Sequence, residues 1–107
     1  MSVSTEILNA VSATIAARRP AFLENRRVDL ARMKDALTAF DFATIQHIGH
    51  NCKGIGTGYG FPEISSIGAR IEIAAKAQDA AEAETAIGQF ERSIQEASFL
   101  EVPIQAG

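Results

Sequence analysis

A histidine, a lysine and a glycine at helical spacing are the residues of this sequence best suited to chemistry. His50, Lys53 and Gly54 stand at positions i, i+3 and i+4, which a helix brings within one turn of each other. Histidine is the side chain that changes charge nearest to neutral pH, so a neutral, nucleophilic ring nitrogen is available. The lysine would offset the charge of an anion on that ring, and the glycine would let a second protein approach. The pattern indicates transient phosphorylation of His50.

The apolar residues around His50 predict that it stands on the solvent face of a helix. They recur at spacings of three and four on the opposite face, at Ile45, Ile48, Cys52, Ile55 and Tyr59. The residues that share the solvent face with His50 are Gln46, Lys53, Gly54 and Thr57. Asp41 is the expected N-cap. Glycines alternate from Gly54 to Gly60, so we expect the helix to end by about Gly58, with Gly60 in the following turn.

Other chemical interpretations of this stretch are weaker. A phosphate-binding glycine loop would need a preceding strand and a Gly-Lys-Ser/Thr ending, which the sequence lacks. His47 lies about 60° around the helix from His50 and is expected to be a plain surface residue beside the site. His47, His50 and Cys52 do not share one face, so no metal site is expected. Cys52 falls on the buried stripe and is interpreted as a core residue.

The sequence His50-Asn51-Cys52-Lys53-Gly54 resembles the His-x-x-Lys-Gly motif of histidine-containing phosphotransfer (HPt) domains. The resemblance extends through Gly60, Phe61, residues 67–72 and Lys76, and it covers roughly residues 20–97. It implies that His50 accepts a phosphoryl group, through its outward nitrogen Nε2, from a receiver aspartate or a sensor histidine kinase. His50 would then pass the group to a response-regulator receiver domain. The receiver would supply Mg²⁺, and this chain would carry no cofactor of its own.

The resemblance also assigns roles to the neighbours of His50. Lys53 and Gly54 match the motif lysine and glycine, and Gln46, one turn earlier, is expected to hydrogen-bond the phosphoryl group. Glu72 is expected to accept a hydrogen bond from the inward ring nitrogen and so fix the tautomer. An ordinary helix ion pair between Glu72 and Lys76, at i and i+4, is an equally good interpretation of those two residues. The residues expected to contact the partner are Asn51, Thr57 and Lys76.

Helical periodicity runs through the whole chain, and no segment alternates as a strand would. The expected fold is all-α, an antiparallel up-down four-helix bundle with an additional N-terminal helix. One HPt-like domain is expected over residues 1–107, with the N-terminal helix at 1–19, the bundle core at 20–99 and a loose tail at 100–107. The expected helices are Ser4 to Ala17, Pro20 to Phe40, one capped by Asp41, one from Pro62, and one from the Asp79 cap to about Phe99.

The first two expected helices have distinct apolar faces. The N-terminal helix should end before Pro20, because the residue preceding a proline is biased away from helix. Its apolar stripe, at Ile7, Leu8, Val11 and Ile15, would pack on the bundle or mediate association. The next helix should bury Leu23, Leu30, Met33, Leu37 and Phe40. Its charged residues, including Arg26 and Asp29, are interpreted as a solvated surface.

Composition limits the function further. The 107 residues suffice for one domain, and 47% hydrophobic content favours a folded core. A net charge of −3 with scattered Lys and Arg does not favour nucleic acid. No apolar run approaches the ~18–20 residues of a membrane span, and residues 1–6 do not resemble a secretory signal. A single cysteine fits a reducing compartment. We therefore expect a cytoplasmic monomer with no membrane partner.

Three functional hypotheses follow. The first is the phosphorelay intermediate, which should not phosphorylate itself because the sequence has no Gly-rich ATP-binding signature. The second is a non-catalytic HPt-like module that binds a receiver or a kinase. The third is a structural or dimerising helical bundle, which the apolar N-terminal helix supports.

Overall fold

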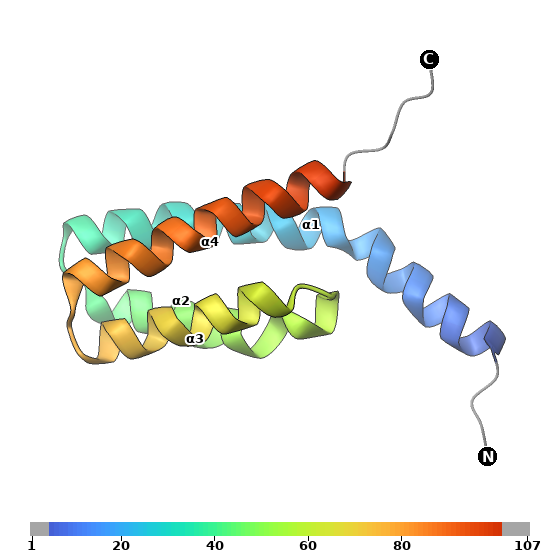
Figure 1. Ribbon diagram of the computed structural model, residues 1–107, viewed down its shortest axis with the longest axis horizontal. Helices are drawn as coiled ribbons and strands as arrows, with labels where there is room; N and C mark the ends of the chain where they lie inside the picture. The colour runs from blue at the N-terminus through green and yellow to red at the C-terminus, as the bar shows by residue number, and fades with distance from the viewer. Residues whose placement is uncertain (1–4, 102–107) are drawn as a thin grey trace.

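The structure, a computed structural model, describes residues 5–101, and nearly all of them are helical (Figure 1). The elements are α1 (Thr5–Thr38), α2 (Phe42–Ile55), the short 3₁₀ helix η1 (Thr57–Tyr59), α3 (Pro62–Lys76) and α4 (Ala80–Glu101). No strand occurs within residues 5–101, so the predicted all-α class is confirmed. No helix in this range is both long enough and apolar enough to cross a membrane.

α1 is one continuous helix of 34 residues, and the predicted break before Pro20 is wrong. Pro20 lies inside the helix, where a proline removes one backbone hydrogen bond and bends the axis. Figure 1 shows α1 bending where its N-terminal part leaves the bundle. The flanking residues are mostly Ala, Arg, Leu and Glu, which favour helix on both sides of the proline.

The structure covers the predicted ends of the chain only in part. Ser4, the predicted start of the first helix, and the tail from residue 102 onward lie outside the described residues. Leu100 and Glu101 were assigned to the tail, but they belong to the last turn of α4.

Each long helix packs against two others. α1 contacts α2 and α4, and α3 contacts the same two helices. Figure 1 shows α1 beside α4 and α2 beside α3. One apolar core fills the space between the helices. Its largest fully buried side chains are Leu23, Met33, Ile45, Ile48, Cys52, Ile64, Ile71 and Phe90.

Local signals place the starts of α2 and α4 and the turn at Gly60 as predicted. Asp41 accepts hydrogen bonds from the Thr44 hydroxyl at 2.6 Å and from the Thr44 backbone N–H at 3.2 Å, and these bonds lower the pKa of Asp41. Asp79 accepts from the backbone N–H of Glu82 at 3.0 Å. Gly60 has a φ of +87°, a left-handed conformation that glycine adopts without strain.

Burial follows the predicted stripes, except that Leu30, Leu37 and Tyr59 are half-buried and two residues near helix ends are exposed. Ile45, Ile48 and Cys52 are fully buried, as expected. Ile55, the last residue of α2, is exposed, so its predicted burial is wrong. Phe40 was also expected to be buried, but it is 68% exposed. α1 ends two residues earlier, and Phe40 lies in the turn with a φ of +53°.

Candidate functional site

Two glycines let α2 and α3 approach each other closely. A Cβ on Gly49 of α2 would lie 2.8 Å from the backbone N of Glu72, and a Cβ on Gly68 of α3 would lie 2.6 Å from the backbone N of Lys53. Both distances are too short for any larger residue. Since His50 follows Gly49 and Glu72 lies one turn after Gly68, this crossing brings the histidine and the glutamate together.

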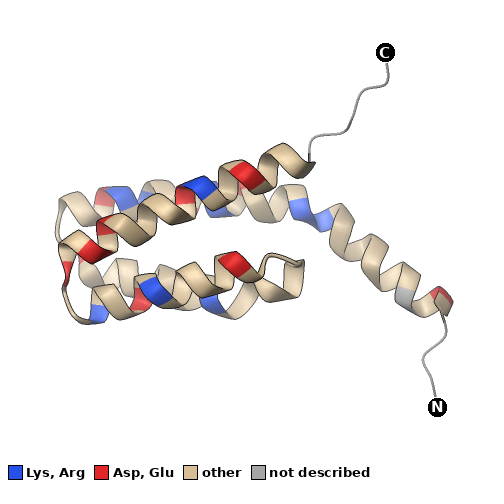
Figure 2. Ribbon diagram, in the orientation of Figure 1, with Lys and Arg blue, Asp and Glu red and all other residues tan. Residues whose placement is uncertain are grey.

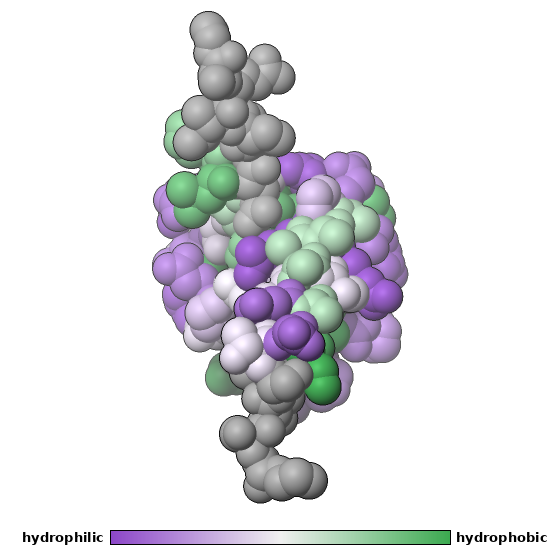
Figure 3. Space-filling view, turned by 90° about the vertical axis from the view of Figure 1, so that its right-hand side faces the viewer, coloured by the Kyte–Doolittle hydropathy of each residue, from purple (hydrophilic) through white to green (hydrophobic). Residues whose placement is uncertain are grey.

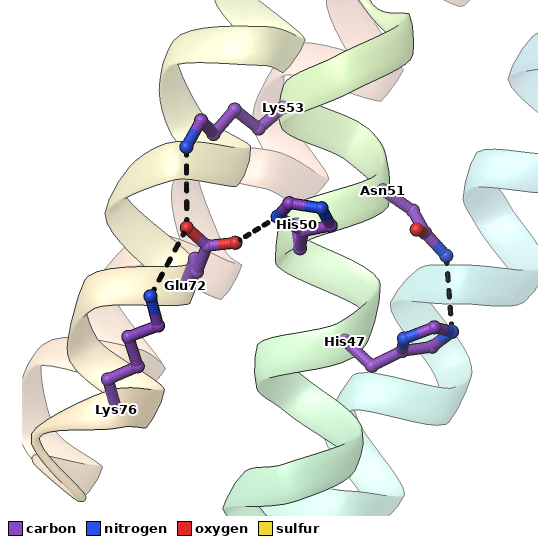
Figure 4. A network of polar contacts seen from close by, with 6 residues as sticks. All are labelled: His47, His50, Asn51, Lys53, Glu72 and Lys76. Atoms are coloured by element: carbon purple, nitrogen blue, oxygen red, sulfur yellow. Dashed lines mark hydrogen bonds and ion pairs between the residues drawn. The ribbon is translucent and has the colours of Figure 1, made fainter.

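The imidazole of His50 is held from one side by Glu72 (Figure 4). Its Nδ1 lies 2.5 Å from Glu72 Oε2. The His50 side chain is 67% exposed, whereas the Glu72 side chain is only 8% exposed. An ionised carboxylate can only accept a hydrogen bond, so Nδ1 is the donor and the neutral ring has its lone pair on Nε2. Nε2 lies on the side of the ring away from Glu72 (Figure 4).

Two lysines share the carboxylate with His50. Lys53 Nζ lies 3.4 Å from Glu72 Oε1, and Lys76 Nζ lies 3.9 Å from the same oxygen. Burial raises the pKa of Glu72, but the hydrogen bond from His50 and the charge of Lys53 outweigh it, so the net pKa is lowered. Both lysines are at least half exposed. Each therefore has further N–H donors available for an anion bound at His50.

His50 stands between two open hollows. One is lined by Gln46, His47, Glu72 and Lys76, together with Ala43. The other is lined by Arg26, Asp29, Asn51, Gly54 and Ile55, and His50 lines both. The structure therefore gathers Gln46, His50, Lys53, Glu72 and Lys76 at one place. A partner can reach the imidazole from two sides.

Three other predicted residues differ in how they relate to this cluster. Gly54 is exposed, and a Cβ there would meet no atom within 4 Å, so the surface above it is open. Asn51 is exposed and places its Nδ2 3.3 Å from His47 Nε2. Thr57 lies in η1 and bonds Ser65 Oγ through its backbone N–H at 2.8 Å and its hydroxyl at 3.0 Å. Thr57 lines neither hollow, so the geometry does not bring it to His50.

Arg26 and Asp29 of α1 are site neighbours that the sequence analysis missed. It took them for a solvated surface, but both are half-buried and line a hollow with His50. Arg26 Nε lies 2.8 Å from Asp29 Oδ2, and its guanidinium stacks over Phe22 at 4.8 Å from the ring centroid. The i, i+3 spacing of Arg26 and Asp29 in the sequence predicts the ion pair between them. Which helix that face of α1 meets is set by packing alone.

Cys52 lies on the inner side of the same helix as His50. Its Sγ is 3.8 Å from Asp29 Oδ2. Burial, followed by the charge of Asp29, raises the pKa of the Cys52 thiol to about 12. A thiol that stays protonated is a poor nucleophile and a poor metal ligand, which agrees with its interpretation as a core residue.

Comparisons with known proteins give no family or relative from which a role for the site could be taken. No family model matches the chain, and no curated protein and no solved structure matches it. Within residues 5–101, no group of three or more His, Cys, Asp or Glu side chains is placed to hold a metal ion. The chemistry open to the site is that of an exposed imidazole with a buried carboxylate on one ring nitrogen and cations nearby.

Proposed function

We propose that this chain is a cytoplasmic histidine phosphotransfer protein built as an antiparallel up-down helical bundle. His50 accepts a phosphoryl group from a receiver aspartate or from a sensor histidine kinase, and passes it to a response-regulator receiver. The observation that carries the proposal is the 2.5 Å contact between His50 Nδ1 and Glu72 Oε2. It fixes the hydrogen on the inward nitrogen and leaves the outward nitrogen nucleophilic.

The transfer is a balanced exchange of one bond for another. The lone pair of His50 Nε2 attacks phosphorus as the bond between phosphorus and the aspartate oxygen breaks, which restores the aspartate carboxylate. The ring gains positive charge, and the ionised Glu72 at Nδ1 stabilises that charge without accepting the proton, as a buried carboxylate does behind a catalytic histidine. The reverse sequence returns the phosphoryl group to the next aspartate.

The cations near His50 suit the charge of a phosphoryl group. Lys53 and Lys76 lie near the same Glu72 carboxylate that holds the ring, and they keep free N–H donors. Gln46 lines the hollow on the Glu72 side of the ring and offers an amide donor. Positioning and charge stabilisation account for most of the catalysis in phosphoryl transfer. The receiver contributes the Mg²⁺ and the acidic pocket, and the open surface at Gly54 admits it.

The test is phosphoryl transfer from a panel of ³²P-labelled receiver domains to the purified protein. His50→Gln is the test variant, and His47→Gln is its matched control because His47 is exposed on the same helix three residues away. We expect acid-labile, alkali-stable label on the wild type and on His47→Gln, and none on His50→Gln. Circular dichroism should show that all three are equally helical.

Label that persists on His50→Gln would refute the assignment of His50. Receiver binding by wild type and His50→Gln alike, with no label on either, would instead support the non-catalytic interaction module.

A further inference from the structure

The beginning of α1, residues 5–18, extends beyond the bundle, and we call these residues the arm (Figure 1). Every side chain described in the arm is exposed except Ile15, which is half-buried. Residues 7–17 carry no charge, and Figure 2 shows this stretch as an uncharged interval between Glu6 and the arginines near Pro20. The arm is the first part of the 34-residue helix α1, and Ile7 and Val11 in it remain exposed. An exposed, uncharged arm is therefore a candidate surface for association.

The arm has an apolar stripe whose members are spaced four residues apart. Ile7 is 58% exposed and Val11 is 52% exposed. With Ile15 they line an open hollow. The other residues that line this hollow are the small residues Ala10 and Thr14. The Thr14 hydroxyl donates to the carbonyl oxygen of Ala10 at 2.9 Å, so it needs no partner from outside. The hollow can accept an apolar side chain without leaving a polar group unpaired.

A second group of exposed apolar side chains lies at the end of α4. Phe99 and Leu100 are 79% and 80% exposed. Leu100 lines a hollow together with Arg19, which lies where the arm joins the bundle. Figure 3 faces this end of the molecule and shows hydrophobic side chains on the protruding helix and others close to the C-terminal trace. Single exposed apolar residues are ordinary, whereas a group of them on one helix face, such as Ile7 and Val11 in the arm, marks an interaction surface.

We propose that the arms of two copies of this chain pack antiparallel and form a symmetric dimer. A symmetric dimer needs a patch that is complementary to itself. The stripe has this property, because Ile7 and Ile15 lie at equal distances on either side of Val11. In an antiparallel pair centred on Val11, each Ile7 faces Ile15 of the second copy and the two Val11 side chains face each other.

Charge selects the antiparallel arrangement. Glu6 stands at the start of the arm, and Arg18 and Arg19 stand at its end. With Val11 at the centre, Glu6 of one copy lies about 3 Å along the axis from Arg18 of the other. A parallel pair would instead place like charges together. A membrane surface suits the arm less well, because helices that bind membranes carry Lys or Arg along their polar face, and residues 7–17 have none.

The dimer should be weak and dependent on concentration. The arm is about 21 Å long at 1.5 Å per residue, so two arms bury less than the ~800 Å² per partner of a standard interface. We expect a dissociation constant on the order of 10–100 micromolar. This proposal replaces the monomer expected from the sequence. It does not depend on phosphotransfer, because His50 is on α2 and the arm is not part of either hollow beside it.

Sedimentation equilibrium over a range of concentrations tests the dimer with two substitutions on the same helix. Val11 is 52% exposed in the arm, and Val28 is 53% exposed on the part of α1 that packs in the bundle. We expect the average mass of the wild type and of Val28→Glu to rise from 11.4 kDa toward twice that value. Val11→Glu should remain at the monomer mass. A wild type that stays monomeric at about 1 mM, or a Val11→Glu variant that dimerises normally, would overturn the proposal.

Cysteine cross-linking tests the antiparallel register. The native Cys52 is buried and should not compete under oxidising conditions. Val11→Cys should form a disulfide-linked dimer at concentrations where Val28→Cys does not. A mixture of Ile7→Cys and Ile15→Cys chains should cross-link more than either chain alone. Failure of Val11→Cys to cross-link while sedimentation still shows the dimer would overturn the antiparallel pairing centred on Val11.

Discussion

At the scale of single residues, Glu72 links the chemistry of the site to the stability of the fold. It is 6% exposed, and a carboxylate removed from water without partners is strongly unfavourable. Here it accepts from His50 and lies near Lys53 and Lys76. The same contacts that orient the imidazole therefore compensate for burial of the charge.

The pKa of Glu72 predicts how acid changes stability. Because that pKa is lowered in the folded protein from its ordinary value of 4.5, ionised Glu72 stabilises the fold above pH 4.5, and this contribution is lost as pH falls below that value. We therefore expect the difference in melting temperature between the wild type and Glu72→Gln to shrink between about pH 6 and about pH 3. Thermal unfolding followed by circular dichroism measures it.

Glu84→Gln is the matched control, because Glu84 is an exposed carboxylate on α4. It should follow the wild type at every pH. A difference between wild type and Glu72→Gln that stays constant across the acid range would show that the carboxylate is not held by His50 and Lys53.

At the scale of helices, the crossing of α2 and α3 determines whether a site exists. Gly49 and Gly68 are both buried at that crossing, and neither can gain a Cβ without moving the opposite backbone. A displacement of even about 1 Å would weaken the short contact between His50 and Glu72, because hydrogen bonds weaken steeply with distance. Positions that contact no ligand can thus control the reactivity of His50.

Two glycine substitutions separate this effect from helix propensity. Gly68→Ala should destabilise the protein by about 1–3 kcal/mol through overpacking and should slow phosphoryl transfer to His50. Gly88→Ala is its counterpart on α4, where a Cβ meets no atom within 4 Å. It should stabilise the protein by about 0.5–1 kcal/mol and leave transfer unchanged. Urea unfolding gives the stabilities, and equal values for the two variants would contradict the close crossing.

At the scale of the whole molecule, the chain divides into a bundle that holds the site and an arm that leaves it. The hydrophobic core begins at Phe22 in the sequence. Where the arm joins the bundle, Arg19 Nε donates to the carbonyl oxygen of Tyr59 at 3.0 Å. Folding of the bundle therefore depends on residues from Arg19 onward.

Removal of residues 1–17 should separate the two parts. We expect the truncated chain to stay folded, with a melting temperature within a few degrees of that of the full chain, because no core residue is lost. In the transfer assay it should be labelled to the same extent as the full chain, and its mass should not rise with concentration. Circular dichroism, the transfer assay and sedimentation give the three results. Unfolding of the truncated chain would show that the arm stabilises the bundle itself.

The sequence by itself determined the features that depend on neighbours along the chain. The spacing of apolar residues fixed which side of α2 is buried, and so predicted the exposure of His50. Asp41 and Asp79 marked helix starts because a short acceptor side chain caps the backbone three residues ahead. Gly60 marked a turn because only the left-handed conformation closes it there. Pro20 misled the prediction, since a local bias against helix was outweighed by good helix formers on both sides.

The tertiary structure decided what depends on residues far apart in the chain. Periodicity gives the buried face of each helix. It does not determine which neighbouring helix that face contacts, or at which position along the helix axis. Close contact of Gly49 with Gly68 sets the relative position of α2 and α3 along their axes. Because of that position, Glu72 reaches His50. The placement of Arg26 beside the same histidine followed from how α1 packs on α2. Side-chain pairs across helices are set by packing of the whole core, which no single stretch of sequence encodes.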